Sequence, residues 1–231
     1  MSTILAFDIY GTLLDTSRMS EALIDHAGLD APKATEISAL WRRYQLEYTW
    51  RLNSMNLYEP FHQVTRKSFI HAASEHQLST NEETITKLMN AYNNLHSFSD
   101  ASPALRKLTK LDGVECVVFS NGTEHMVRSA LTFGGIDSFP KAIYVADSVR
   151  KYKPAPEIYQ GLLKSVGKEA DPQHCWLVSG NPFDVVGACA QGLSTIWVDR
   201  AGKGWADRLG GSPTEVVSSL EDICELPELQ M

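Results

Sequence analysis

Asp8 is the first side chain whose position in the sequence suggests chemistry. It directly follows the apolar run Ile4–Phe7, and the turn-forming Gly11 and Thr12 come soon after. A short apolar run closed by turn residues predicts a buried strand. Ligands of an open parallel sheet bind beyond the carboxyl ends of its strands, where Asp8 would lie. We therefore interpret Asp8 as a functional residue rather than a helix cap, a role that Asp15 fills better.

Further polar groups follow two later apolar runs. Ser120 and Asn121 come directly after residues 114–119, so their donors and the amides of the next helix would point at one spot. Capping of that helix is an equally supported interpretation. Asp184 follows residues 175–178 and would bring a second carboxylate to the same edge, whether or not it also caps its own helix.

A lysine in the loop before Pro156 completes this set. Lys153, if it lies near Asp8, would keep that carboxylate ionised, because an opposite charge lowers the pKa of a carboxyl group. Lys151 is a competing candidate that the sequence separates only weakly from Lys153. Two carboxylates and a lysine suit hydrolysis through a covalent aspartyl intermediate, which needs a nucleophile and a group that activates water. These groups would be Asp8 and Asp184.

The elements that must position these residues alternate along much of the chain. Apolar runs predict strands at residues 4–7, 114–119, 142–145, 175–178 and 194–198. Helical patterns lie between them, at residues 124–133, 156–166 and 184–190, with a further helix that ends near Leu111. Strands and helices in this order predict an α/β fold with a doubly wound parallel sheet, whose strand ends meet at one edge.

Residues 19–98 interrupt this alternation with helical patterns and no convincing strand. One amphipathic stripe comprises Ile37, Leu40, Trp41, Tyr44 and Tyr48. We expect two domains: a core of residues 1–15 and 99–231, and a helical cap of residues 16–98 inserted after the first strand. A block that leaves from that strand end would stand over the sheet edge and enclose a pocket.

Composition restricts the possible partners and compartment. The 231 residues are 43% apolar and carry a net charge of -7, with scattered lysines and arginines. We therefore expect neither nucleic acid nor a membrane as a partner, and a cytoplasmic location, because no secretory or membrane-spanning pattern is present. The widely spaced cysteines are expected to be buried thiols, neither zinc ligands nor a disulfide set. They are Cys116, Cys175, Cys189 and Cys224.

Four segments resemble, in order and approximate spacing, the signatures of the haloacid dehalogenase superfamily. They read FDIYGTLLD, FSNG, KPAPEIY and LVSGNPFD. The resemblance implies a Rossmann-like core with an inserted cap, and makes Asp8 the nucleophile. Phosphatases of this superfamily carry an acid where Tyr10 stands, which protonates the leaving alkoxide, and a magnesium-binding acid where Asn181 stands. A halide ion needs no such proton, and a hard cation needs charged oxygen ligands.

The chain is therefore more similar to the L-2-haloacid dehalogenases. This resemblance implies hydrolysis of a short L-2-haloalkanoic acid to a D-2-hydroxy acid with inversion, through an ester on Asp8, without metal or cofactor. The catalytic residues that it implies are Asp8, Thr12, Lys153, Ser179, Asn181 and Asp184. The substrate-binding residues that it implies are Tyr10, Arg42, Phe61, Ser120, Asn121, Tyr159 and Phe183. Related enzymes are commonly homodimers, which implies the same here.

Among these residues, the resemblance gives each group a separate task. Arg42, Asn121 and Phe183 would receive the halide, and Ser120 would hold the substrate carboxylate. Ser179, Asn181 and Asp184 would hold the attacking water. Thr12 would support the Asp8 carboxylate, Tyr159 would bond near Lys153, and Tyr10, Phe61 and Trp41 would form an apolar wall. Related dehalogenases often have a second serine where Gly180 stands, which bears on where the water is held.

Arg42 and its neighbour Arg43 both follow Trp41, and the sequence favours Arg42 as the halide ligand. Arg43 has Glu47 four residues on, a spacing typical of a solvated ion pair, whereas Arg42 has no acid three or four residues away.

Two other functions fit the same scaffold. One is a magnesium-dependent phosphatase acting on a small phosphoester, and the other is a non-catalytic binding protein.

Overall fold

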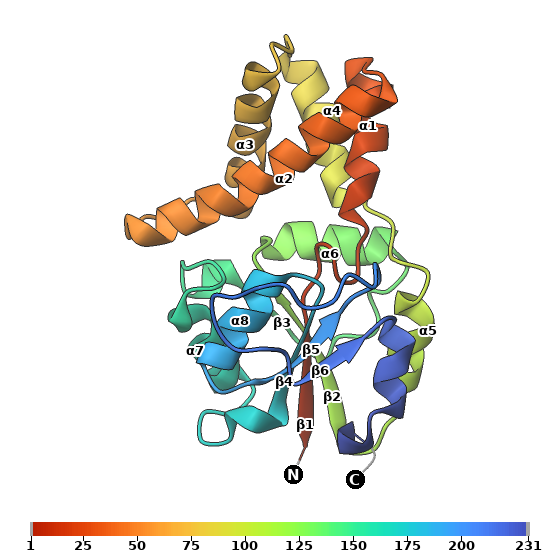
Figure 1. The fold of residues 1–231 in the computed structure, drawn as a ribbon, viewed down its shortest axis with the longest axis vertical. Coiled ribbons are helices and arrows are strands. Elements are labelled where there is room, and N and C mark those ends of the chain that lie inside the picture. Colours follow the sequence, from red (N-terminus) through yellow and green to blue (C-terminus); the bar gives the residue numbers. More distant parts are fainter. Residues whose placement is uncertain (1, 230–231) are drawn as a thin grey trace.

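A six-stranded parallel sheet forms the centre of the computed structural model, which describes residues 2–229 (Figure 1). The strand order is β3-β2-β1-β4-β5-β6, and all five neighbouring pairs are parallel. The strands are β1 (Thr3–Phe7), β2 (Val114–Ser120), β3 (Ile143–Val145), β4 (Cys175–Ser179), β5 (Ser194–Val198) and β6 (Glu215–Val217). Residues 1, 230 and 231, which the predicted core domain includes, lie outside the described residues.

Helices cover both faces of this sheet. Figure 1 shows α7 and α8 on one side and α5 on the other. The helices that accompany the sheet are α5 (Ala101–Leu108), α6 (Glu124–Phe133), α7 (Pro156–Ser165) and α8 (Pro182–Ala190). Short 3-10 helices are η1 (Thr16–Arg18), η2 (Ala146–Ser148), η3 (Pro172–His174), η4 (Leu220–Glu225) and η5 (Pro227–Leu229). The predicted doubly wound α/β fold is therefore confirmed.

The five predicted strands are all present, with ends that differ from the prediction by at most one residue. Strand β1 is wholly apolar from Ile4 onward and is buried in the middle of the sheet, as a strand covered on both faces requires. Strand β6 was not predicted. It has only three residues, Val216 in its centre is exposed, and it pairs with β5 alone, so its sequence carries little periodic signal.

Four helices between β1 and α5 form a separate block above the carboxyl edge of the sheet (Figure 1). They are α1 (Met19–Ala27), α2 (Ala31–Ser54), α3 (Phe61–Glu75) and α4 (Glu82–Asn93). Asp30 caps α2, because its side chain accepts a hydrogen bond from the amide of Lys33 at 2.8 Å. Ile37, Trp41 and Tyr44 of the predicted stripe are buried, which orients α2 against its neighbours.

The two linkers that join this block to the sheet lie side by side. The amide of Asp15 in the first linker donates to the carbonyl of His96 in the second at 2.9 Å. The amide of Phe98 donates back to the carbonyl of Leu13 at 2.9 Å. The two linkers therefore form a hydrogen-bonded pair where the helical block joins the sheet.

Arg200, in the loop after β5, ties both linkers to the sheet. Its guanidinium donates to the two carboxylate oxygens of Asp100, each at 3.0 Å, and to the carbonyl oxygen of Thr12 at 2.8 Å. Asp100 stands where the second linker enters α5, and Thr12 lies in the loop that follows Asp8. One side chain therefore fixes the loop that follows Asp8 and the return linker relative to each other.

The cysteines are largely as expected. Cys116, Cys175 and Cys224 are buried, and the described residues contain no disulfide. Cys189 contradicts the prediction of a buried thiol, because it is partly exposed. It lies in the last turn of α8, where its Sγ donates to the carbonyl of Ser212 in a surface loop.

Replacement of Arg200 should loosen the attachment of the helical block. We expect Arg200→Met to lower the free energy of unfolding by about 1–3 kcal/mol, because the partly buried Asp100 carboxylate loses its two hydrogen bonds from the Arg200 guanidinium. Urea unfolding measures this change. Lys107→Met is the control, because it breaks an exposed ion pair with Glu221 and should change stability far less. Equal losses in both variants would contradict the assigned role.

Candidate active site

The polar residues that follow the strands meet at the carboxyl edge of the sheet, beneath the helical block. Strand β1 lies between β2 and β4, so Asp8 is flanked by Ser120 at the end of β2 and Ser179 at the end of β4. The loop after β3 brings Lys153 to the same place. The sheet topology therefore produces the convergence that the sequence predicted.

The Asp8 carboxylate is held by three side chains from different segments. Its Oδ2 accepts hydrogen bonds from Thr12 Oγ1 at 2.7 Å and from Asn181 Nδ2 at 2.8 Å. Its Oδ1 accepts a bond from Lys153 Nζ at 3.1 Å. The side chain is nearly buried, so these donors replace water and fix the direction of the carboxylate.

Lys153 is almost fully buried, and all three of its ammonium protons have acceptors. Nζ lies 2.7 Å from Asp184 Oδ2, 3.1 Å from Asp8 Oδ1 and 2.8 Å from the carbonyl oxygen of Phe119. It also stands 4.1 Å from the centre of the Phe119 ring. The ammonium therefore bridges the two carboxylates that the sequence placed at this edge.

Lys151, the competing lysine, does not reach the site. Its Nζ donates to Asn56 Oδ1 at 2.6 Å, on an exposed part of the surface. The backbone amide of Lys153, by contrast, donates to Asn121 Oδ1 at 2.9 Å, which ties its loop to the end of β2. The geometry selects Lys153.

Asp184 is fully buried at the start of α8. Its Oδ1 accepts a hydrogen bond from the hydroxyl of Tyr159 at 2.8 Å, and its Oδ2 faces Lys153. Burial raises the pKa of Asp184 above its ordinary value, Lys153 opposes this shift, and the charge of Asp8 adds to it. Burial, together with Asp184, raises the pKa of Tyr159 well above its ordinary value, so the phenol stays protonated and donates.

The segment after β4 contacts the loop that follows Asp8 through a backbone amide. The amide of Gly180 donates to Thr12 Oγ1 at 2.9 Å, and the amide of Asn181 donates to Ser179 Oγ at 3.1 Å. A Cβ atom on Gly180 would lie 2.5 Å from the carbonyl oxygen of Gly11. The second serine of related dehalogenases therefore does not fit here without a shift of the backbone.

Arg42 comes down from α2 to the same place. Its Nη2 lies 3.4 Å from Asn181 Oδ1 and 3.4 Å from the carbonyl oxygen of Tyr10, while its Nη1 donates to Gln45 Oε1 at 2.6 Å. The helical block therefore places a second cation near Asp8, because the side chain of Asn181 contacts both Arg42 and Asp8.

The prediction of a solvated Arg43–Glu47 ion pair is confirmed for the exposure of Arg43 and is wrong for its partner. Arg43 is exposed, and its guanidinium lies 5.4 Å from the centre of the Tyr44 ring. Glu47 instead pairs with Arg51, four residues further along α2, at 3.4 Å. Both pairings have helical spacing, so packing of the long side chains on neighbouring aromatic rings decides between them.

Aromatic residues pack beside the charged cluster that Asp8, Lys153 and Asp184 form. The ring of Tyr10 stacks on Phe61 with centroids 6.0 Å apart, and its other neighbour is Tyr92 at 5.4 Å. Trp41, which we expected in the same wall, lies one layer further back, where it packs on Tyr92 and Phe69. The indole nitrogen of Trp41 donates to the carbonyl oxygen of Thr65 at 2.8 Å, and the side chain is buried. Trp41 is therefore a core residue of the helical block.

The hydroxyl of Tyr10 is buried and has no hydrogen-bond partner. Burial raises its pKa far above the ordinary value, so the group is a neutral phenol. Its ring covers Gly122, where a Cβ atom would lie 2.9 Å from Tyr10 Cε2 and 3.3 Å from Ser120 Oγ. Ser120 Oγ accepts a bond from the Gly122 amide at 3.0 Å. An unpaired hydroxyl beside Ser120 is a place for a polar group of a ligand.

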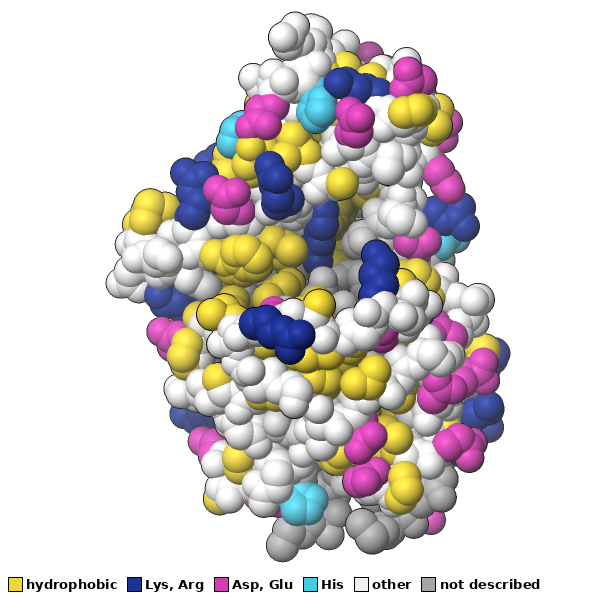
Figure 2. Space-filling view, viewed as in Figure 1, with side chains coloured by type: hydrophobic (Ala, Val, Ile, Leu, Met, Phe, Trp, Pro, Cys, Tyr) yellow, Lys and Arg dark blue, Asp and Glu magenta, His cyan; other side chains and the backbone are white. Residues whose placement is uncertain are grey.

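Phe183 stands at the junction of the two parts of the molecule. It is partly buried, and its ring meets Trp50 of α2 edge-on with centroids 5.6 Å apart. Nearby, a hollow of about 250 Å³ is lined by Trp50, Asn53, Pro154 and Ala155. Figure 2 shows hydrophobic side chains and lysines or arginines gathered along this junction. Phe183 is therefore at the rim of the site rather than in its centre.

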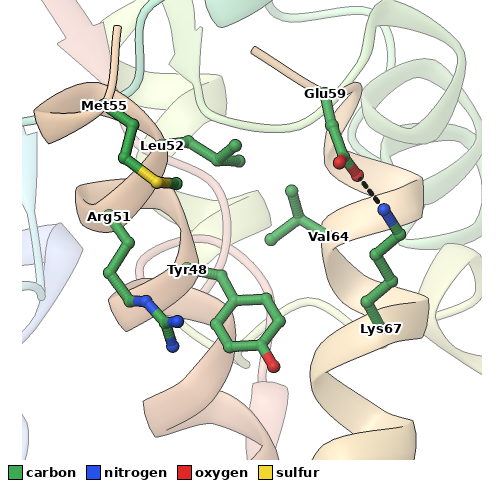
Figure 3. Close-up of a pocket in the computed structure, with 7 residues that line it drawn as sticks. All are labelled: Tyr48, Arg51, Leu52, Met55, Glu59, Val64 and Lys67. Atoms are coloured by element: carbon green, nitrogen blue, oxygen red, sulfur yellow. Dashed lines mark hydrogen bonds and ion pairs between the residues drawn. The ribbon is translucent and has the colours of Figure 1, made fainter. Parts of the chain in front are cut away.

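A second hollow of about 250 Å³ lies on the helical block, between α2 and α3 (Figure 3). Its walls carry Tyr48, Arg51, Leu52, Met55 and Val64, and an ion pair of 2.6 Å joins Glu59 to Lys67 at its side. None of the residues of the charged cluster lines this hollow, so it is separate from the candidate active site.

Magnesium, which the phosphatase interpretation would require, does not fit these residues. Every carboxylate oxygen of Asp8 and Asp184 already accepts a hydrogen bond, and the Lys153 ammonium stands between the two groups. The positions that would add charged oxygen ligands hold Tyr10 and Asn181, and Asn181 turns its amide nitrogen toward Asp8. A hard divalent cation needs the opposite donor set.

A buried aspartate at a strand end, paired with a lysine beneath a helical block, is an arrangement that fits a hydrolase. The profile of the haloacid dehalogenase-like hydrolases matches residues 3–192. The chain belongs to this family of enzymes.

Most of the predicted site residues lie together. Arg42 and Phe61 come from the helical block. Those at the edge of the sheet are Asp8, Tyr10, Thr12, Ser120, Asn121, Lys153, Tyr159, Ser179, Asn181 and Asp184.

Curated relatives cover nearly the whole chain. An (S)-2-haloacid dehalogenase of Pseudomonas sp. (strain YL) is 34% identical over 97% of this chain and 94% of its own. The (S)-2-haloacid dehalogenase 4A of Burkholderia cepacia is 34% identical over 85% of this chain and 82% of its own. The L-2-haloacid dehalogenase of Xanthobacter autotrophicus, solved also with chloropropionic acid covalently bound, has a TM-score of 0.88 at 26% identity, covering 99% of both chains.

One residue that contacts Arg42 was not predicted from the sequence. Gln45 on α2 is fully buried and bonds Arg42. A glutamine on an amphipathic helix ordinarily faces solvent, so only its spacing of three residues from Arg42 could have suggested the contact.

Asp184 should make the free energy of unfolding depend on pH. The pKa of Asp184 in the folded protein is above its ordinary value of 3.8. Between pH 3.8 and this raised pKa, the folded chain therefore keeps a proton on Asp184 that the unfolded chain has released. The contribution of Asp184 to stability is therefore present at lower pH and is lost as pH rises through the raised pKa. In urea unfolding, the wild type should lose stability relative to Asp184→Asn over this range. A constant difference would contradict the assignment.

Proposed function

We propose that the protein is a hydrolytic (S)-2-haloacid dehalogenase that converts short L-2-haloalkanoic acids to D-2-hydroxy acids with inversion, without a metal. The observation that carries the proposal is the contact set of Asp8, which is held by Lys153, Thr12 and Asn181 while Arg42 stands on the other side of Asn181. The names of the relatives, (S)-2-haloacid dehalogenases, support the same activity.

In the first step, an oxygen of Asp8 attacks C2 of the substrate from the side opposite the halogen. A carbon–oxygen bond forms, the carbon–halogen bond breaks, and the halide leaves with the electron pair. Arg42 and Asn121 receive the halide, with Phe183 beside them. Lys153 and Thr12 hold the carboxylate in a fixed direction by hydrogen bonds, which aligns the nucleophile in a nearly dry site.

The substrate is held by its carboxylate and its short carbon chain. Ser120, together with the backbone amides of Ile9 and Tyr10, binds the carboxylate. The stacked rings of Tyr10 and Phe61 form the apolar wall for the alkyl group. The buried Tyr10 hydroxyl, which lacks a partner, supports a polar ligand group beside Ser120.

In the second step, water hydrolyses the ester on Asp8. Ser179, Asn181 and Asp184 hold this water, and Asp184 accepts its proton as the water oxygen attacks the ester carbonyl carbon. The bond between the carbonyl carbon of Asp8 and the substrate oxygen then breaks, and Asp184 returns its proton to the departing alkoxide, so that the product leaves as the hydroxy acid. Asp8 is regenerated as a carboxylate that contains the water oxygen, and its remaining proton passes to solvent. Tyr159 and Lys153 hold Asp184 in position for this task.

Tyr10 and Asn181 favour a carbon–halogen bond over a phosphoester. A departing alkoxide needs a proton, and the Tyr10 phenol is a poor donor because burial raises its pKa. A departing halide needs none. Asn181 likewise replaces an acidic metal ligand by an amide that donates to Asp8. The alternatives of a magnesium-dependent phosphatase and of a non-catalytic binding protein are accordingly less favoured.

We also propose the domain boundaries, assembly and compartment. Residues 1–15 and 99–231 form the core, and residues 16–98 form the cap. The chain works as a cytoplasmic homodimer, for which the exposed apolar side chains of Trp50, Met55 and Leu57 on and after α2 supply area. Among residues 2–229, no helix is long and apolar enough to cross a bilayer.

A halide-release assay tests the proposed function. With (S)-2-chloropropanoate, we expect chloride release that a chelator leaves unchanged. Asp8→Asn should lower the rate by at least about 10³-fold, because the covalent step loses its attacking oxygen. Phosphate release from a small phosphoester that depends on added magnesium would instead support the phosphatase. No turnover of either substrate would support the binding protein.

A single turnover in heavy-oxygen water distinguishes covalent catalysis from direct attack by water. We expect the label in Asp8, measured by mass spectrometry of its peptide, because the product takes its new oxygen from the carboxylate. Label that passes directly into the hydroxy acid would reject Asp8 as the nucleophile.

Arg42 and Arg43 form a matched pair of neighbouring arginines. Arg42→Ala should lower kcat for chloropropanoate by about 100-fold, since the departing chloride loses a preorganised donor. Arg43→Ala, which removes an exposed side chain, should stay within about twofold of the wild type. Similar effects of the two substitutions in a steady-state halide assay would undo the assignment of the halide site to Arg42.

A further inference from the structure

Gln45 is a fully buried amide inside the helical block, less than one turn after Arg42 on α2. We propose that Gln45 is a positioning residue that aims the Arg42 guanidinium at the departing halide while leaving its charge uncompensated. The inference rests on the proposed dehalogenase function, whose residues it extends from the site into the interior of the block.

The orientation of the Gln45 amide is fixed by a relay of donors. The hydroxyl of Thr65 donates its single proton to the carbonyl oxygen of Phe61 at 2.8 Å. Thr65 Oγ1 must therefore accept at its contact with Gln45, which identifies the donor as Nε2, at 2.8 Å. The other end of the amide, Oε1, consequently faces Arg42. The backbone of α3 thus determines which atom the arginine meets.

Oε1 of Gln45 has both of its lone pairs in use. It accepts a bond from Arg42 Nη1 at 2.6 Å and one from the hydroxyl of Tyr92 at 2.9 Å. Tyr92 also packs its ring on Tyr10 in the site. The amide is therefore locked from three sides, and it can hold Arg42 in one direction without moving itself.

Arg42 has weaker contacts on the side of the sheet. Its bonds to Asn181 and to the Tyr10 carbonyl are each 3.4 Å long, whereas its bond to Gln45 is 2.6 Å. A free arginine side chain has many rotamers, and holding it beforehand removes that entropy from the step in which the halide leaves. The tight contact lies within α2, so the direction of the guanidinium is set before any ligand is present.

The choice of an amide has an electrostatic reason. A carboxylate at position 45 would accept the same bond but would neutralise Arg42 in a buried place. A neutral acceptor leaves the positive charge, and the remaining N–H donors, for a chloride or bromide ion. Position 45 therefore controls the halide affinity as well as the geometry.

Gln45→Glu tests the electrostatic part. This substitution keeps the shape of the side chain but also exchanges the Nε2 donor to Thr65 for an oxygen, so Thr65→Val, which loses the same bond without adding a charge, is its control. We expect kcat for 2-chloropropanoate to fall about 100-fold in Gln45→Glu, further than in Thr65→Val, with a smaller change in KM. The loss should shrink from chloro- to bromo- to iodo-substrates, because better leaving groups need less stabilisation. Bromide affinity, measured by calorimetry on the folded protein, should fall about tenfold or more.

Two threonine substitutions test the positioning part. Thr65 and Thr49 are both fully buried, and each donates its hydroxyl to a backbone carbonyl, Thr49 to that of Leu46 at 2.6 Å. Only Thr65 also accepts from Gln45. We expect Thr65→Val to weaken bromide binding and to lower kcat several-fold, and Thr49→Val, on the same helix as Gln45, to leave both near the wild-type values.

The outcomes separate this inference from the proposed function. Wild-type bromide affinity in Gln45→Glu, or equal effects of the two threonine variants, would overturn the inference, with thermal unfolding used to confirm that each variant is folded. Bromide binding that depends on Gln45 and Thr65 in a protein that releases no halide from any haloacid would keep the inference and reject the dehalogenase. A wild type that binds no bromide would reject the inference.

Discussion

The buried ammonium of Lys153 is the interaction on which the site depends. Two carboxylates, Asp8 and Asp184, come from neighbouring strand ends and would repel each other in a place with little water. A single cation between them makes their burial possible, because its protons satisfy both groups and the Phe119 carbonyl. The parallel sheet supplies this geometry, since the segments after β1, β3 and β4 all reach one edge.

A second cation reaches the cluster from the helical block, which makes the placement of that block part of the electrostatics. Arg42 lies beside Asn181, which bonds Asp8. Gln45 holds the arginine from within the block, and Arg200 holds the paired linkers from the sheet. The charged groups thus belong to two parts of the molecule, and each part has its own device for fixing them. A site divided in this way can receive an anion where the two parts meet.

Much of the fold and of the charged cluster could be predicted because the signals are local. Apolar runs of four to six residues marked five of the strands, and turn residues marked their ends. Once the strands are parallel, their carboxyl ends converge whatever the details of packing, so Asp8 and Asp184 could be placed together. The three-residue strand β6 escaped this reasoning, because Val216 in its centre is exposed and the segment is too short for a pattern.

Periodicity and chain order encode the layered α/β sheet, the helical insertion and the carboxylates at the sheet edge within a few residues, so these features could be predicted without coordinates. Contacts between long polar side chains could not. In the folded chain Lys153 rather than Lys151 reaches Asp8, Glu47 pairs with Arg51, and Gln45 is buried against Arg42. Such contacts join groups whose local sequence fits several partners equally well. Only the packing of whole elements fixes the distances that choose among them.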